Sequence, residues 1–122
     1  MDYFFDSSVI VELVLGNEEY LRFRELTIIT STLHMAEVYY FLLKKYNEKT
    51  ADYWIKRLDF KLINMIKLED SINAAKFKFK NNKDNLSYAD CIGYIISKKL
   101  NMKFLTRDSK FKGRENVEFL KD

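Results

Sequence analysis

Residues 86–108 read LSYADCIGYIISKKLNMKFLTRD, and this stretch predicts a helix, a tight turn at Asn101 and a short strand. Its first half carries apolar residues at helical spacing, and its second half carries a short apolar run. An aspartate stands near each end, with Asp90 in the first turn of the helix and Asp108 just past the strand. A helix that leads straight into a strand is typical of α/β folds.

The rest of the chain repeats this alternation. Further strands are expected at residues 3–5, 26–29, 61–66 and 116–120. Further helices are expected at residues 7–15, 18–25, 32–46, 50–58 and 69–80. Short strands that alternate with helices imply an α/β fold in which a parallel sheet of four to five strands is covered by helices on both faces. We expect one domain that spans residues 1–122.

The composition is that of an ordinary folded protein. Hydrophobic residues make up 48% of the 122 and charged residues 32%, so disorder is not expected. No apolar run approaches the ~20 residues that span a membrane, so no membrane partner is expected. The N-terminus lacks the features of a secretory signal. Cys91 is the single cysteine, which agrees with a reducing cytoplasm.

The basic residues allow two interpretations. The net charge of +3 is too small to predict a nucleic-acid partner by itself. Lys76, Lys80 and Lys83 nevertheless share one helical face, because residues three and four apart are neighbours. This face is either solvated, which is the more common case, or a rim that binds phosphate groups together with Arg107.

Four acids occupy comparable places in the predicted fold. Asp6 and Asp108 directly follow predicted strands, at the edge where open α/β sheets collect ligands. Glu37 and Asp90 lie in early turns of helices. Asp6, Asp90 and Asp108 also have an ordinary explanation as helix caps, and Ser87 with Asp90 matches a capping box.

Glu37 is harder to explain as a structural residue. It lies on the stripe of its helix that we expect to face the core, where a carboxylate must be paired, protonated or bound to a metal. The apolar residues of this stripe are Leu33, Ala36, Tyr40, Phe41 and Leu43. A group of carboxylates without neutralising bases repels itself unless a cation lies among them. Such oxygen ligands suit Mg²⁺ or Mn²⁺, and clusters of this kind recur where phosphodiesters are cut.

Other chemistries find little support in the sequence. His34 is the only histidine, which excludes a zinc hydrolase site. A Ser-His-Asp arrangement would need His34, which we expect to face away from Glu37 and to be structural or exposed. Cys91 is expected to be a small buried residue rather than a nucleophile. With only three glycines there is no phosphate-binding loop, and Gly93 is expected to permit close packing on the sheet.

Four stretches resemble, in chain order, the acidic motifs of PIN-domain ribonucleases. They are FFDSSVIVEL at 4–13, TLHMAEVYYFL at 32–42, LSYADCIGYII at 86–96 and FLTRDSKFKG at 104–113. The likeness covers nearly the whole chain and is greatest to the small toxins of VapBC-type toxin–antitoxin systems. It implies a PIN-like three-layer fold and an endoribonuclease that uses Mg²⁺ or Mn²⁺.

The resemblance also implies a role for each matching residue. The metal ligands would be Asp6, Glu37, Asp90 and Asp108. Ser8 and Thr106 would be polar residues that support these ligands. The chain departs from the family pattern at Gly93-Tyr94, where small or aliphatic residues are usual, and in its sparse glycine and absent proline. These departures touch no acid, so they bear on substrate detail rather than on catalysis.

The resemblance further implies partners. Such toxins act on RNA, are generally homodimers and are held inactive by a small antitoxin. Tyr39, Tyr53 and Trp54 would supply an apolar groove for the antitoxin if exposed, although we expect at least one of them in the core. Two alternatives remain. One is a PIN-like nuclease of RNA processing or DNA repair without an antitoxin, and the other is a non-catalytic α/β binding module in which the acids are only caps.

Overall fold

The computed structural model describes residues 2–63 and 66–121. Its strands are β1 (Tyr3–Phe5), β2 (Ile28–Thr30), β3 (Phe60–Leu62), β4 (Lys103–Thr106) and β5 (Val117–Phe119). Its α-helices are α1 (Ser7–Leu15), α2 (Thr32–Lys45), α3 (Glu48–Arg57), α4 (Leu68–Lys80) and α5 (Tyr88–Lys99). Short 3₁₀ helices are η1 (Glu18–Phe23), η2 (Asn82–Asp84) and η3 (Ser109–Phe111).

In the described residues the strands form one parallel sheet in the order β3-β2-β1-β4-β5. The chain moves from β1 outwards to β3 and then resumes on the other side of β1 with β4. Such a reversal opens a crevice at the carboxyl ends of the two central strands, where α/β proteins bind ligands. The N–H of Asp6 donates to the Leu105 carbonyl over 2.9 Å, so the β1–β4 pairing reaches this edge. The predicted parallel α/β class is confirmed.

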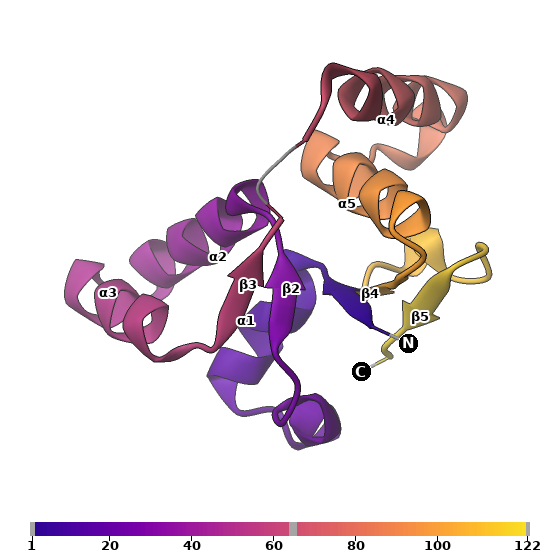
Figure 1. Ribbon diagram of the computed structural model, residues 1–122. Coiled ribbons are helices and arrows are strands. Elements are labelled where there is room, and N and C mark those ends of the chain that lie inside the picture. Colours follow the sequence, from indigo (N-terminus) through magenta and orange to yellow (C-terminus); the bar gives the residue numbers. More distant parts are fainter. Residues whose placement is uncertain (1, 64–65, 122) are drawn as a thin grey trace.

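Helices cover both faces of the sheet, which gives three layers (Figure 1). Successive residues of a strand point to opposite faces. Phe5 and Leu105 therefore join one core with α1, α2 and α3, whereas Phe4 and Phe104 join a second core with α5. Helix α4 packs on α5 and lies outside it. None of the described helices combines the length and apolar character needed to cross a membrane.

Several element borders differ from those expected. Strand β2 begins at Ile28 rather than at residue 26, because the N–H of Leu26 bonds back to the Phe23 carbonyl in a turn. Helix α3 begins at Glu48 rather than at residue 50, because the Asn47 side chain caps it. Strand β3 ends at Leu62 instead of residue 66, and residues 64 and 65 lie outside the described range.

Helix α2 turns a different face to the core from the one expected. The residues Leu33, Ala36, Tyr40 and Leu43 are exposed, and Phe41 is half-buried. The face that is buried consists of His34, Met35, Val38 and Leu42. The apolar pattern is ambiguous because this helix carries apolar residues on nearly every side. It also misleads because the polar residue His34 belongs to the buried face.

Candidate active site

All four predicted acids line one groove at the crevice between β1 and β4. The groove has a volume of about 420 Å³, and its lining includes Asp6, Glu37, Asp90 and Asp108 together with Ser7, Ser8, Tyr40 and Arg107. The acids come from four places in the chain: the end of β1, helix α2, the start of α5 and the end of β4. The groove therefore exists only in the folded chain.

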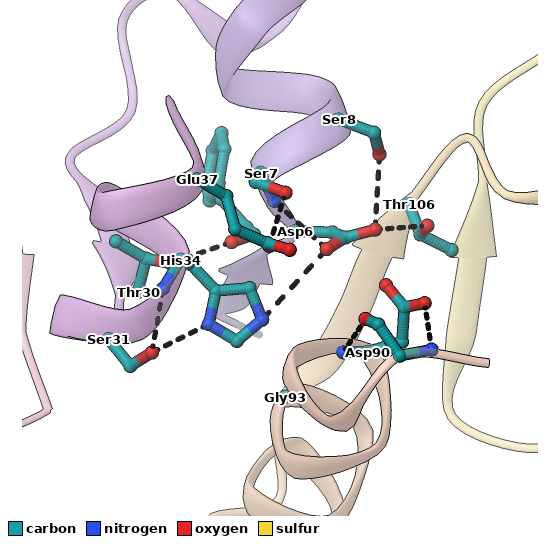
Figure 2. A network of polar contacts seen from close by, with 12 residues as sticks. Asp6, Ser7, Ser8, Thr30, Ser31, His34, Glu37, Asp90, Gly93 and Thr106 are labelled. Carbon is teal, nitrogen blue, oxygen red and sulfur yellow. Dashed lines mark hydrogen bonds and ion pairs between the residues drawn. The ribbon is translucent and has the colours of Figure 1, made fainter. Parts of the chain in front are cut away.

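Asp6 is the most buried of these acids, with 2% of its surface exposed. It is the N-cap of α1, and its Oδ1 accepts a hydrogen bond from the Ser7 N–H at 2.9 Å. Its Oδ2 accepts from the hydroxyls of Ser8 at 3.1 Å and Thr106 at 2.7 Å. Figure 2 shows these donors converging on the carboxylate from α1 and from the end of β4. The contacts agree with the supporting role of Ser8 and Thr106, which stays a prediction.

Glu37 and Asp90 are fixed by serines. Glu37 is half-buried at the groove rather than turned into the core, and its Oε1 accepts from the Ser7 hydroxyl at 2.9 Å. Asp90 accepts from the Ser87 N–H at 3.0 Å, and its own N–H donates to Ser87 Oγ at 3.1 Å. The capping box predicted at the start of α5 is confirmed. It holds Asp90 in place at the groove.

Asp108 is connected to Asp6 through Thr106. The Asp108 side chain caps η3 by accepting from the Lys110 N–H at 3.0 Å. Its own N–H donates to Thr106 Oγ1 at 3.1 Å, and the same hydroxyl donates to Asp6. One threonine thereby couples the acids that follow the two central strands.

Burial and the charge of Asp90 raise the pKa values of two acids in the groove, Asp6 and Glu37. Burial, followed by the charge of Asp90, raises the pKa of Asp6 to about 7, although the hydrogen bonds from Thr106 and Ser8 act to lower it. Burial also raises the pKa of Glu37, against the hydrogen bond from Ser7, and Asp90 adds to the rise. A groove of this kind favours taking up positive charge, either as protons or as a cation.

His34 lies directly beside Asp6. Its side chain is fully buried, and its Nε2 is 3.9 Å from Asp6 Oδ1. The expectation that His34 faces away from Glu37 is wrong, because both side chains lie beside Asp6 (Figure 2), as residues three apart on a helix can. Burial lowers the pKa of His34 to about 4, with the backbone of Ala89 acting in the opposite direction. The ring is therefore neutral near pH 7.

Gly93 makes room for this ring. A Cβ atom at position 93 would lie 2.8 Å from His34 Nε2 and 2.9 Å from Phe104 Cε1. Both distances are shorter than van der Waals contact, so the close packing expected of Gly93 is present against both α2 and β4. A glycine inside a helix, where it costs roughly 1 kcal/mol relative to alanine, is the one sequence signal for a close neighbour here.

The predicted basic residues fall into two groups. Arg107 lines the groove and pairs with Glu12 over 3.0 Å between Nη1 and Oε1. Lys76, Lys80 and Lys83 are exposed, and none of these three lines the groove. Lys78, which sequence reasoning left out of the site, donates to the Leu86 carbonyl and lies 5.2 Å from the ring centre of Tyr88. Lys78 therefore contacts the residues just before Asp90, which lines the groove.

The remaining candidates are placed as follows. Cys91 is buried, and burial raises the pKa of its thiol to about 11, as expected for a small buried residue. Tyr53 is 47% exposed. Tyr39 and Trp54 are partly buried and pack against the core that contains α1, α2 and α3, but none of the three aromatic residues is among its buried members, although at least one was expected there.

The donor set suits a hard divalent cation. Four carboxylates offer oxygen atoms, which Mg²⁺ and Mn²⁺ prefer. Over the ranges 2–63 and 66–121, no three His, Cys, Asp or Glu side chains lie close enough together to hold one ion. Mg²⁺ does not require that, because it usually keeps several waters and uses only one or two protein carboxylates. The residues therefore fit such an ion.

Comparison with known proteins identifies the family. The model of the PIN domain matches residues 3–116. The chain belongs to the PIN domain family. This membership places it among the PIN-domain nucleases. No curated protein matches its sequence.

Solved structures share the PIN fold across most of this chain. A toxin–antitoxin complex from Klebsiella pneumoniae is 19% identical, covers all of both chains and has a TM-score of 0.75. VapBC2 from Rickettsia felis, bound to a DNA fragment from its promoter, is 17% identical over 99% of this chain and 98% of that one, with a TM-score of 0.68. VapC20 from Mycobacterium tuberculosis, a sarcin–ricin loop cleaving toxin, is 13% identical over 84% and 85%, with a TM-score of 0.66.

Proposed function

We propose that this PIN-domain protein is an endoribonuclease that depends on Mg²⁺ or Mn²⁺ and acts as the toxin of a toxin–antitoxin pair. The observation that carries the proposal is the set of interacting carboxylates in one groove, where burial and the charge of Asp90 raise the pKa of Asp6 to about 7. Asp6, Glu37, Asp90 and Asp108 would hold the ion, one or two of them directly and the others through its bound waters. The fold resembles that of a sarcin–ricin loop cleaving toxin, which favours RNA over DNA as the substrate.

The residues of the groove have different roles in this proposal. A divalent ion at this groove would lower the pKa of water and stabilise charge on the leaving oxygen. Ser7, Ser8 and Thr106 hold the Asp6 carboxylate in one orientation by three hydrogen bonds. Glu37, whose Oε1 is fixed by Ser7, is the candidate to accept a proton from the attacking water at its other oxygen, because its pKa is raised. Arg107 would neutralise a substrate phosphate at the groove.

A cleavage assay tests this proposal. Purified protein with structured RNA and Mg²⁺ should cut the RNA, and EDTA should stop the reaction. Asp90→Asn should lower the rate at least about 100-fold, because it removes a ligand charge. Glu25→Gln, which removes an exposed acid outside the groove, should leave the rate unchanged. Cleavage that continues in EDTA, or at full rate in the Asp90 variant, would contradict the metal mechanism.

The toxin assignment draws on the structural neighbours, two of which are toxin–antitoxin assemblies. The exposed residues Leu33 and Leu43 on α2, with Tyr40 at the groove, offer an apolar surface for an antitoxin segment. A homodimer and a cytoplasmic location belong to the same proposal. Expression of the wild type should arrest growth, and co-expression of a small protein encoded just upstream should relieve the arrest. Growth that is unaffected by the active nuclease would favour the alternative without an antitoxin.

A further inference from the structure

Both nitrogen atoms of the buried His34 ring face polar side chains (Figure 2). Its Nδ1 is 2.6 Å from the hydroxyl oxygen of Ser31, and the same oxygen accepts the His34 backbone N–H at 3.2 Å. Its Nε2 faces Oδ1 of Asp6 at 3.9 Å and makes no hydrogen bond of normal geometry within the part of the chain that the structure describes, while the backbone of Ala89 in α5 favours a proton on the ring. A buried polar nitrogen without a bond is unfavourable, so its position calls for an explanation.

The contacts of Ser31 indicate which ring nitrogen carries the proton. Ser31 is fully buried, and among its described contacts the acceptor for its hydroxyl proton is His34 Nδ1. A proton on Nδ1 would leave that hydroxyl without an acceptor and would turn the Nε2 lone pair towards a carboxylate oxygen. A proton on Nε2 lets Ser31 donate to Nδ1 and directs an N–H towards Asp6. The second arrangement satisfies both groups.

We propose that His34, with its proton on Nε2, is a positioning residue that orients the Asp6 carboxylate towards the groove. A distance of 3.9 Å is too long for a hydrogen bond, so the N–H acts as a fixed dipole beside Oδ1. Such a dipole is effective because the pair is shielded from water. The inference rests on the proposed function, in which Asp6 is a metal ligand.

Gly93 completes this arrangement from the opposite side. The absence of a Cβ there allows Nε2 to lie against α5, because a methyl group would sit 2.8 Å from it. The ring is therefore held between Ser31 of the α2 N-cap and the backbone of α5. Helix α5 also carries Asp90, so one helix fixes a metal ligand directly and a second one through His34.

The first experiment uses the metal-free protein, in which the single histidine needs no assignment. A long-range ¹H–¹⁵N spectrum at about pH 8, where the imidazole is neutral, should show a protonated Nε2 and an unprotonated Nδ1. Ser31→Ala should weaken this preference. The side-chain ¹³C resonance of Asp6 should shift in His34→Leu and stay in His34→Gln, because glutamine places an amide N–H where Nε2 was. A proton on Nδ1, or an Asp6 side-chain resonance that does not shift in His34→Leu, would overturn the inference.

The second experiment measures Mg²⁺ binding by calorimetry. His34→Leu should weaken binding about 10- to 100-fold, which is the usual effect of losing a group that orients a ligand, and His34→Gln should restore most of it. Val38→Ala, which thins the same buried face without touching an acid, should lose stability but keep Mg²⁺ affinity. Gly93→Ala should weaken binding in the wild type and have little further effect in His34→Leu.

These outcomes separate the inference from the proposed function. A wild-type protein that binds no Mg²⁺ would overturn both. A wild-type protein that binds Mg²⁺ while His34→Leu binds it equally well would overturn the inference alone. A loss of affinity in Val38→Ala as large as in His34→Leu would also overturn it, because the effect would then be general destabilisation.

Discussion

The Asp6 carboxyl group accepts three hydrogen bonds, yet burial and Asp90 raise its pKa to about 7. In the metal-free protein near neutral pH, Asp6 is therefore partly protonated. Its neighbour His34 has the opposite behaviour, because burial lowers the pKa of that ring to about 4. The two side chains lie 3.9 Å apart, so the pH dependence of folding contains both contributions.

Replacing Asp6 should separate these contributions. As pH falls from about 7 to 4, folded Asp6 takes up a proton that the unfolded chain mostly does not, which stabilises the fold by about 3 kcal/mol. Over a similar range His34 takes up a proton in the unfolded chain but mostly not in the folded one. This difference destabilises the folded state by about 3 kcal/mol. We expect these two effects largely to cancel in the wild type. Asp6→Asn should lose about 3 kcal/mol between pH 7 and 4.

Urea denaturation of the metal-free proteins at several pH values measures this difference. At about pH 8 the Asp6→Asn variant should be more stable than the wild type, because the wild type then buries a charged carboxylate. Glu25→Gln serves as the control, since it removes an exposed acid. A variant with the same pH profile as the wild type would show that Asp6 does not titrate as described.

At the residue scale the sequence reveals the acids but not their neighbour. The four acids stand out because each directly follows a strand or lies in an early turn of a helix. They are Asp6, Glu37, Asp90 and Asp108. His34 does not stand out, because its significance depends on Gly93, which is distant in the chain and meets it only in the folded protein. Ser31 adds a second contact that sequence spacing presents only as a helix cap.

At the scale of elements, the start of α5 combines a structural and a proposed catalytic role, and two substitutions should separate them. Ser87→Ala removes the hydroxyl that accepts the Asp90 N–H and should lower stability by about 1 kcal/mol while cleavage is kept. Asp90→Asn keeps an oxygen that can accept the Ser87 N–H, so it should fold with small loss of stability but lose cleavage. Thermal denaturation and the RNA assay measure the two effects. Equal loss of activity in both variants would argue that Asp90 acts only as a cap.

Helix α4 is attached to the molecule mainly through α5. Asp70, which is 3% exposed, caps the start of α4 at the Lys67 N–H and pairs with Lys99 of α5 at 3.0 Å. Asp70→Ala should cost about 2 kcal/mol, because it removes a cap and a charge-assisted bond. Hydrogen exchange should speed up in α4 more than in α1. Protection lost evenly over both helices would indicate that α4 unfolds only with the whole domain.

Element type follows from the sequence better than element borders or faces. Strands and helices alternate as expected because the apolar pattern changes period from one to the next. Borders shift where side chains intervene, as Asn47 does by capping α3 two residues early. The buried face of α2 could not be read, because Leu33 and Tyr40 follow the helical period as well as Met35 and Val38 do.

At the scale of the whole molecule, the strand order creates the site. The reversal beside β1 brings Asp6 and Asp108 together although 102 positions separate them, and helices from opposite faces of the sheet supply Glu37 and Asp90. Repulsion among the four acids arises only when the whole domain is folded, so it lowers the free energy of unfolding of the whole domain. Neutralising them should therefore stabilise the entire fold.

Mg²⁺ should accordingly raise the melting temperature of the wild type. An ion that binds only the folded protein adds about 2.7 kcal/mol at a concentration 100 times its Kd. The gain should be larger at about pH 8 than at pH 6, because protons compete for Asp6 below its pKa of about 7. Asp6→Asn should lose most of the gain, and Glu25→Gln should keep it. Scanning fluorimetry with and without Mg²⁺ measures the shift. A melting temperature that does not respond to Mg²⁺ at either pH would favour the binding module whose acids serve only as caps.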